Sequence, residues 1–325
     1  MSHTSNISLE YQQAVDQAVY FRLPSAGLIQ IKGDGRIDLI QRQTTNDVSK
    51  LSPNAVITTV LTSAAGRILD VLQVFESDGT LLAHTLPTRG ESTSKFLSGK
   101  IFFMDKVEVA DLGPGFAQIE IGGRRAEEML GQAGFGMLPK EDQFTPASVD
   151  SSEVFILGPS RLSTHTRFRL LCPVETAERL AGTLETAGLS EINAQTREIL
   201  RVESGHPQVD SELTENYTPL ELNLDWAISD SKGCYTGQEV IARQTNYDKV
   251  TKKLVQLRAD HPLAPGSKVR LEDKTIGEIT SAAYSPKYGQ ISLGVIRRPH
   301  HQPGTKVSIL YGDGEFPAEV FLPSS

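Results

Sequence analysis

The pattern of the last quarter of the chain constrains the fold most. From Thr251 onward no helical periodicity is present, and short apolar runs alternate with turn signals such as Pro265-Gly266 and Gly312-Asp313-Gly314. The runs cover residues 254–258, 268–271, 274–283, 290–296, 305–310 and 318–322. Strands of this number and length form a small all-β module, and a barrel closes the edges of its sheet. We therefore expect a C-terminal β-barrel over residues 249–325, after a domain boundary near residue 248.

The first 248 residues interleave strand and helix patterns. Three strand-like runs follow one another at residues 56–61, 68–75 and 80–86, and Asp78-Gly79 between the last two is a hairpin signal. The polar segment 141–152 is predicted as a loop. This alternation predicts an α+β fold with mainly antiparallel sheets.

Charge and cysteine content narrow the classes of function. The net charge of −8 argues against a general nucleic-acid binder, and no apolar run is long enough for a membrane helix. The N-terminus has no basic segment followed by an apolar core, so we expect no targeting segment and a cytoplasmic location. Two cysteines, Cys172 and Cys234, predict a reducing compartment and cannot supply the four thiolates of an iron–sulfur cluster. The histidines are not spaced as zinc ligands, so no metal site is expected.

The segment K-G-C-Y-T-G-Q-E at residues 232–239 places a cation, a residue without a side chain and a thiol in consecutive positions. Thr236 and Glu239 have the T-x-x-E spacing of a capping box, which predicts that Thr236 caps a helix. Cys234 would then precede a helix N-terminus, where the macrodipole favours negative charge, and the Lys232 ammonium would act in the same direction. If the site is open to water, a reactive thiol with a depressed pKa is expected.

Two interpretations of Cys234 remain open from the residues alone, a reactive thiol and a buried structural cysteine beside a surface lysine. Gly233 would let the backbone turn sharply or approach a ligand. Cys172 ends a predicted strand and is expected to be a small buried hydrophobe.

Two carboxylates stand out by their positions. Asp70 lies within an apolar strand and faces either outward or into a pocket, and its spacing favours the outward face. Glu203 falls at the C-terminal end of the helix predicted over residues 193–203, where the helix dipole disfavours a carboxylate. It is either an ordinary surface residue or one held by a ligand or by a cation such as Arg201.

The segment 232–239 resembles the signature of the YgfZ family of folate-binding proteins, relatives of the T-protein (aminomethyltransferase) of the glycine cleavage system. The resemblance extends over nearly the whole chain. Residues 63–70 are similar to the T-protein stretch that carries its catalytic aspartate, with Asp70 in the matching place. Residues 201–205 resemble the R-x-E-x-G segment whose glutamate, Glu203 in this chain, faces the pterin in T-proteins.

The resemblance implies two interlaced α+β subdomains and a terminal β-barrel around a central channel that binds tetrahydrofolate or a derivative. Asp70 or Glu203 would accept hydrogen bonds from the pterin edge. Lys232 or Arg243 would provide a cation for the glutamate tail of the folate, and Gly233 would allow close approach of the backbone.

Two functions follow from the resemblance. In the first, the protein is a folate-binding accessory factor that assembles or repairs iron–sulfur clusters in client enzymes. Cys234, with Lys232 beside it, would then be a redox-active or cluster-contacting thiol. In the second, the protein is an aminomethyltransferase in which Asp70 stabilises positive charge developing on a folate nitrogen. T-proteins match this region only over residues 235–237, without the K-G-C, so the thiol favours the first function. A folate-binding module without chemistry is a third possibility, and whether the protein is an enzyme stays open.

Overall fold

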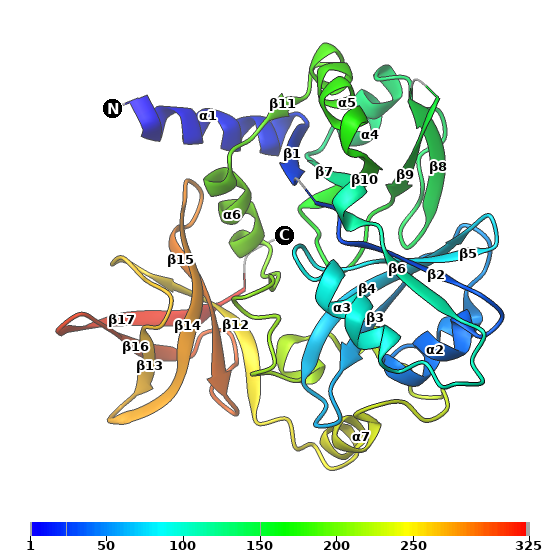
Figure 1. Cartoon of the computed structure of the whole chain (residues 1–325). Helices are drawn as coiled ribbons and strands as arrows, with labels where there is room; N and C mark the ends of the chain where they lie inside the picture. Colours follow the sequence, from blue (N-terminus) through cyan, green and yellow to red (C-terminus); the bar gives the residue numbers. More distant parts are fainter. Residues whose placement is uncertain (1, 24, 150, 323–325) are drawn as a thin grey trace.

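Three β-structures organise the chain in the computed structural model, which describes residues 2–23, 25–149 and 151–322 (Figure 1). They are a five-stranded sheet, a six-stranded sheet and a closed six-stranded barrel. The predicted α+β class, with a small C-terminal barrel, is confirmed. Within the described residues, no helix has the length and apolarity needed to cross a membrane.

The five-stranded sheet has the strand order β3-β4-β5-β2-β6, and all its pairs are antiparallel. Its strands are β2 (Leu28–Lys32), β3 (Ile57–Thr62), β4 (Ile68–Ser77), β5 (Thr80–His84) and β6 (Glu108–Asp111). Helices α2 (Arg36–Gln43) and α3 (Gly90–Ser98) supply Leu39, Ile40 and Leu97 to the core on one face of this sheet. The hairpin predicted at Asp78-Gly79 joins β4 to β5 with both residues at positive φ.

The six-stranded sheet has the order β11-β1-β7-β10-β9-β8, with one parallel pair, β1 with β11. Its strands are β1 (Val19–Leu23), β7 (Phe116–Gly122), β8 (Phe144–Val149), β9 (Ser152–Leu157), β10 (Thr166–Pro173) and β11 (Ser190–Glu191). Helices α4 (Ala126–Gln132) and α5 (Val174–Thr186) pack their apolar residues against it. Cys172 lies in this core, as predicted from its position at a strand end.

The two sheets are interlaced, because β1 begins the six-stranded sheet and the chain returns to it only after completing the five-stranded one. A shared apolar cluster joins them, with Leu28 and Phe75 from one sheet and Phe144, Phe155 and Leu171 from the other. The ring centroids of Phe75 and Phe144 are 4.7 Å apart. Burial of these aromatic side chains therefore fixes the two sheets to each other.

The C-terminal barrel closes in the order β12-β15-β14-β13-β16-β17, with antiparallel pairs throughout. Its strands are β12 (Lys252–Ala259), β13 (Lys268–Leu271), β14 (Lys274–Ser285), β15 (Gly289–Arg297), β16 (Lys306–Tyr311) and β17 (Gly314–Phe321). Because the sheet closes on itself, none of its strands is left with an unpaired edge.

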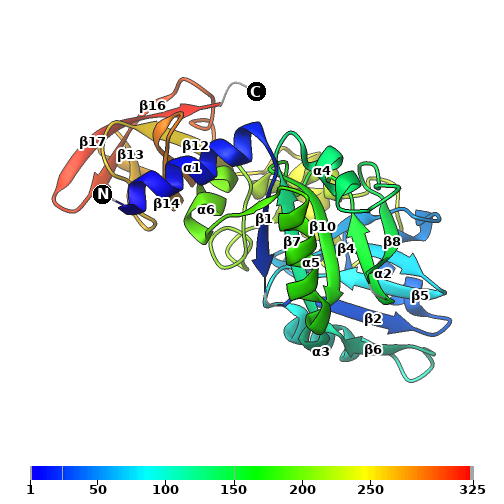
Figure 2. The same ribbon diagram turned by 90° about the horizontal axis from the view of Figure 1, so that it is seen from above.

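The remaining helices connect these parts. Helix α1 (Ser2–Asp16) runs from beside the barrel to the six-stranded sheet, and α6 (Ala194–Glu203) lies between that sheet and the barrel (Figure 2). Helix α7 (Gln238–Asn246) precedes the barrel, and single 3-10 turns occur at η1 (Val48–Lys50), η2 (Gly113–Gly115), η3 (Pro219–Leu222) and η4 (Asp225–Ala227). Asn193 caps α6, with its side chain accepting a hydrogen bond from the Thr196 backbone N–H at 2.8 Å.

Two local predictions were wrong. The segment 141–152 contains β8, an edge strand that pairs with β9. The sequence of β8 contains polar residues and lacks the apolar alternation that predicts a strand. An edge strand at the surface needs only one apolar face, so its sequence gives a weak signal. The cap of α7 is Gly237, at φ +85°, and not Thr236. The Thr236 hydroxyl donates instead to Gln43 Oε1 at 3.1 Å, because the segment is tied to the end of α2.

Candidate functional site

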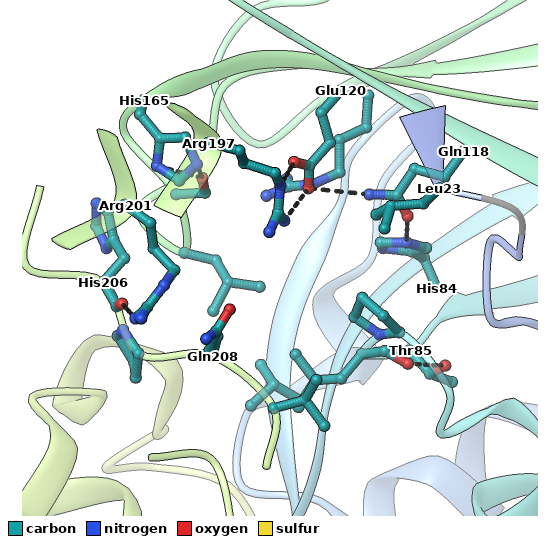
Figure 3. Close-up of a pocket in the computed structure, with 18 residues that line it drawn as sticks. Leu23, His84, Thr85, Gln118, Glu120, His165, Arg197, Arg201, His206 and Gln208 are labelled. Atoms are coloured by element: carbon teal, nitrogen blue, oxygen red, sulfur yellow. Dashed lines mark hydrogen bonds and ion pairs between the residues drawn. The ribbon is translucent and has the colours of Figure 1, made fainter. Parts of the chain in front are cut away.

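A cavity of about 160 Å³ opens between the two sheets and α6 (Figure 3). The residues that line it come from β1, β4, β5, β7 and β10, from α6, and from the segments after β5, before β10 and after α6. They are Leu23, Val71, His84, Thr85, Leu86, Pro87, Gln118, Glu120, Leu162, Ser163, His165, Arg169, Arg197, Arg201, His206, Pro207, Gln208 and Val209. The cavity is therefore built from segments far apart in sequence that only the interlaced topology brings together.

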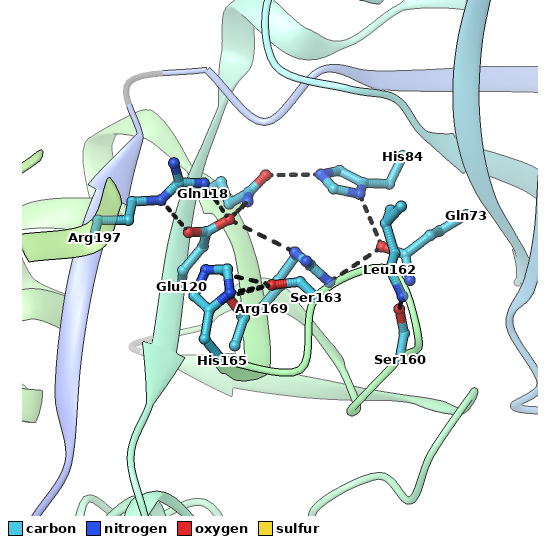
Figure 4. Close-up of polar contacts among 11 residues, drawn as sticks. Gln73, His84, Gln118, Glu120, Ser160, Leu162, Ser163, His165, Arg169 and Arg197 are labelled. Atoms are coloured by element: carbon cyan, nitrogen blue, oxygen red, sulfur yellow. Dashed lines mark hydrogen bonds and ion pairs between the residues drawn. The ribbon is translucent and has the colours of Figure 1, made fainter. Parts of the chain in front are cut away.

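One wall of the cavity is a buried carboxylate held by two guanidinium groups (Figure 4). Glu120 Oε2 accepts from Arg197 Nε at 2.6 Å, and Glu120 Oε1 accepts from Arg197 Nη2 at 3.0 Å and from Gln118 Nε2 at 3.1 Å. Arg169, opposite Glu120 in the β7–β10 register, has its Nε 3.8 Å from Oε1. Burial opposes ionisation of Glu120, but the two arginines outweigh it and hold the pKa of its carboxyl at about 2.

This wall can serve a polar ligand. A carboxylate has about four acceptor positions, and three are used within the described residues. Two guanidiniums share the single charge of Glu120, so the trio carries one net positive charge. It therefore offers both an acceptor and cationic donors to a planar ligand with polar edges.

Three histidines beside this wall are kept neutral. Burial lowers the pKa of His84 to about 4, of His165 to about 3 and of His206 to about 4, and nearby arginines act in the same direction. The His84 ring lies between two glutamine side chains, with Nε2 2.7 Å from Gln118 Oε1. Neutral imidazoles can act as hydrogen-bond donors or acceptors without adding positive charge to the cavity.

The other wall is apolar. It consists of the side chains of Leu86, Pro87, Leu162 and Val209, whereas Leu23 lies beside Gln118 (Figure 3). An apolar wall facing a polar one suits a flat heteroaromatic ring, whose faces are apolar and whose edges carry donors and acceptors.

Arg201 connects the cavity to the barrel. Its side chain is 3% exposed, and its guanidinium donates to Glu198 Oε2 at 2.8 Å, to the His206 carbonyl at 2.6 Å and to Ser281 Oγ on β14 at 2.7 Å. Glu212 lies 3.4 Å away and also accepts from Ser281 Oγ. The sequence suggested Arg201 as one possible partner of Glu203, but in the structure Arg201 pairs with Glu198, Glu212 and Ser281.

Asp70 is fully buried, so the expectation of an outward face was wrong. Strand β4 is covered on both faces, and a register shift next to Asp70 breaks its alternation. Asp70 Oδ1 accepts from the backbone N–H groups of Val71 and Leu86 at 2.8 and 3.0 Å, and Oδ2 accepts from Thr93 Oγ1 at 2.6 Å. Burial raises the pKa of this carboxyl to about 7. Asp70 thus lies directly behind Val71 and Leu86, two residues of the cavity wall.

Glu203 is not among the residues that line the cavity. Its carboxylate accepts from Tyr11 Oη at 3.0 Å and from Ser285 Oγ at 2.5 Å, which ties α6 to α1 and to the end of β14. Burial raises the pKa of this carboxyl, and the two hydroxyls oppose the effect. The structure does not bring Glu203 together with Asp70.

Lys232 is 9% exposed and is bound to the end of α2. Its ammonium donates to the carbonyls of Gln41, Thr44 and Asn46 at 2.9, 2.7 and 2.6 Å. Burial lowers the pKa of the ammonium to about 8. These contacts satisfy carbonyls at a helix C-terminus, where a cation is favoured. Lys232 therefore has a structural partner, and it is not among the residues that line the cavity.

Cys234 is an exposed free thiol, so the buried structural interpretation does not apply to it. Gly233 is exposed and at ordinary φ, and a Cβ built on it would meet nothing within 4 Å. Arg243 is exposed on α7. None of the three lines the cavity, so the structure separates the thiol segment from the polar wall.

Sequence reasoning missed the residues of the polar wall. Gln118 and Glu120 lie two apart on β7, and Arg169 is opposite Glu120, so all three project from one face of the sheet. The available signal was a set of polar residues inside otherwise apolar strands. Gln73 and His84, which are paired in the β4–β5 register, belong to the same set. Only Asp70 was recognised in this way.

Comparison with known proteins extends the resemblance. The family described as GCVT N-terminal domain matches residues 2–232, and the glycine cleavage T-protein C-terminal barrel domain matches residues 252–324. A putative chloroplastic transferase from Arabidopsis thaliana is 28% identical over 87% of this chain and 66% of its own length. An aminomethyltransferase from Thermoanaerobacter pseudethanolicus is 26% identical over 94% of this chain and 85% of its own.

A solved structure agrees on the fold. The crystal structure of glycine cleavage system aminomethyltransferase T from Bartonella henselae matches with a TM-score of 0.85 and 18% identity. The match covers 97% of this chain and 88% of that one. With both domain profiles matched in order, the chain belongs to the GCVT family, the glycine cleavage T-protein fold with its C-terminal barrel.

Proposed function

We propose that this protein binds a reduced folate in the cavity between the two sheets and serves as an accessory factor in iron–sulfur cluster assembly or repair. The observation that carries the folate part is the pairing of an apolar wall with the Glu120 and arginine wall in one small cavity. A volume of about 160 Å³ suits one ring system, and the rest of the ligand would extend toward the opening.

The residues present fit a pterin. Its flat faces would pack against Leu86, Pro87 and Leu162, and its N–H edge would meet the remaining acceptor capacity of Glu120. A bound folate supplies a carrier for one-carbon groups or a redox-active ring. The contribution of this chain is to orient the ring and to exclude water from one of its faces.

The exposed thiol favours the accessory role over the transferase. Cys234 is accessible to a protein partner, whereas Asp70 is enclosed and already accepts three hydrogen bonds. A carboxylate that stabilises charge on a folate nitrogen must face that nitrogen. Direct contact of Asp70 with a ligand would require the wall formed by Val71 and Leu86 to move.

Aminomethyl transfer to tetrahydrofolate is the second candidate, and the relatives favour it. The Thermoanaerobacter protein and the Bartonella structure carry the name aminomethyltransferase, and the Arabidopsis relative is a putative transferase. Asp70 occupies the position matching the T-protein aspartate and lies behind the cavity wall. This arrangement allows an indirect role through Val71 and Leu86.

Calorimetric titration with tetrahydrofolate tests the shared premise. Val209→Trp places an indole in the cavity and should weaken tetrahydrofolate binding, because the space that the ring would occupy is then filled. Val174→Trp, at an exposed position on α5, is the matched control and should bind normally. Glu203→Gln distinguishes the sites: a loss of affinity in this variant alone would place the pterin against Glu203 and contradict the proposed cavity.

The use made of the folate needs a second experiment. In cells lacking the protein, wild type and Cys172→Ala should restore the activities of cluster-dependent enzymes, and Cys234→Ala should not. Full rescue by Cys234→Ala would reject the accessory role. Glycine cleavage activity with purified carrier protein, lost in Asp70→Asn, would establish the transferase in its place.

A further inference from the structure

Two cations face each other on the barrel without a carboxylate partner. Lys252, the first residue of β12, is directly opposite Arg297, the last residue of β15, in the antiparallel register. No salt bridge joins either of them to an acidic residue in the described part of the chain. Directly opposite residues have Cβ atoms about 5 Å apart on the same face of a sheet, and like charges in such pairs are destabilising.

These two residues line the same surface hollows. One cleft of about 390 Å³ lies between the β14–β15 region and residues 216–217, and a second of about 660 Å³ lies beside Arg298 and Pro299. Lys252 and Arg297 belong to both clefts. Their charged groups are therefore presented to open space that a ligand can enter.

The other charges around the clefts are already paired. Lys268 Nζ is 2.5 Å from Glu278 Oε2, and Arg298 Nη1 is 2.6 Å from Asp248 Oδ1. These two pairs cancel, so the clefts keep two net positive charges, on Lys252 and Arg297. In a protein with a net charge of −8, this is a local exception.

One wall of the first cleft comes from outside the barrel. Tyr217 is buried, and the Lys252 Nζ lies 5.9 Å from the centre of its ring, which keeps the lysine side chain turned toward the cleft. The Tyr217 carbonyl accepts a hydrogen bond from the Ile68 N–H at 3.1 Å, at the start of β4. A ligand in this cleft would therefore bridge the barrel and the five-stranded sheet.

We propose that this cleft binds a compact dianion, the phosphate group of a small molecule, between Lys252 and Arg297. A phosphate group carries about two negative charges and offers several oxygen acceptors within a few ångströms. It matches two cations on directly opposite residues, since the planar guanidinium binds it in bidentate fashion and the ammonium binds it as a point charge. The site is separate from the folate cavity, and none of its residues lines that cavity.

Titration with inorganic phosphate tests the proposal, with the ionic strength held constant by sodium chloride. Binding should be saturable, and Lys252→Gln and Arg297→Gln should each weaken it by about tenfold or more, because hydrogen bonds to charged groups are among the stronger ones. Lys140→Gln makes the same charge change on an exposed residue of another domain and should leave binding unchanged. Malonate, a dicarboxylate, is titrated in parallel and should bind more weakly than phosphate.

Stability without added anion gives an independent readout. If the two cations repel each other, Lys252→Gln and Arg297→Gln should melt no lower than wild type at low salt. If both variants melt at a lower temperature than wild type and bind phosphate with unchanged affinity, the two cations have a structural role and the proposal is overturned. Phosphate binding that is absent or unsaturable in wild type, or weaker than that of malonate, would overturn it as well. Tetrahydrofolate binding by Lys252→Gln should equal that of wild type, so this test is separate from the proposed function.

Discussion

Asp70→Asn should make this protein more stable at neutral and alkaline pH. The folded-state pKa of about 7 lies above the reference value of 3.8, because burial disfavours the charged carboxylate. The folded chain therefore holds a proton that the unfolded chain releases between about pH 4 and 7. Ionisation of this aspartate in the unfolded chain lowers the stability of the fold progressively through this window, and the loss reaches about 4 kcal/mol near pH 8.

The geometry allows asparagine to replace the carboxylate without leaving an unsatisfied group. An amide oxygen can accept from the Val71 and Leu86 N–H groups as Asp70 Oδ1 does. The amide NH₂ can donate to Thr93 Oγ1, which reverses the direction of the present 2.6 Å hydrogen bond. The desolvation cost of the charge is then removed and the packing is kept.

Urea denaturation at pH 5 and pH 8 measures the effect. At pH 5 the same linkage gives a cost of about 2 kcal/mol, so the advantage of Asp70→Asn should grow by about 2–3 kcal/mol between the two pH values. Asp34→Asn, at an exposed turn, makes the same change in net charge and serves as the control. An Asp70→Asn protein that is equally or less stable than wild type at both pH values would refute the reasoning. A gain in stability would indicate that the carboxylate is kept for function against its cost.

Three further predictions use other parts of the chain. Glu120→Gln leaves the buried guanidinium of Arg169 and the half-buried one of Arg197 without their carboxylate, and it should lower the free energy of unfolding at pH 7 by about 3–5 kcal/mol. Since ionised Glu120 stabilises the fold above about pH 4.5 and that contribution is lost toward pH 2, denaturation series at falling pH should show this difference shrinking. Gly237→Ala should lower the melting temperature, because φ is +85° and its Cβ would meet a backbone carbonyl at 2.6 Å, whereas Gly233→Ala should not change it. A thiol reagent should modify only the exposed Cys234 in the native protein. Cys172 should react only on unfolding, because it is buried and burial raises the pKa of its thiol to about 11. Two modified thiols in the native state would contradict this prediction.

The fold was predictable where local pattern and turn chemistry agreed. The barrel strands are punctuated by Pro265-Gly266 and Gly312-Asp313-Gly314, and each run between such signals is a strand. Strand β8 was missed because it lies at a sheet edge and alternates half-buried with exposed residues. The capping box at Thr236 was wrong because tertiary hydrogen bonds to α2 took its hydroxyl. A local motif predicts only what local contacts decide.

The candidate site was predictable only in part, for the same reason. Asp70 was singled out as an isolated charge in an apolar strand, but its orientation depended on the cover provided by other elements. The polar wall combines Glu120 from β7, Arg169 from β10 and Arg197 from α6. These residues come into contact only because of the sheet register and the position of the helix. The spacing of residues within one segment cannot predict contacts between segments that are far apart in the sequence.

The segment 232–239 is anchored to the rest of the fold on both sides of Cys234. Lys232 is bound to three carbonyls at the end of α2, and Thr236 is bound on both sides, accepting from Thr62 Oγ1 at its carbonyl and donating from its N–H to the Arg42 carbonyl. These contacts fix the chain before and after Cys234, and only Gly233 and Cys234 between them are exposed. Lys232 and Thr236 therefore have a structural role, because they fix the backbone on either side of the exposed thiol. Since this backbone is already ordered, a partner that binds the thiol would lose little conformational entropy in ordering it. If the thiol acts on a client protein, substitutions at the two positions should differ in effect. Substitution of Lys232 should lower the stability of the fold, and substitution of Cys234 should remove function without changing stability.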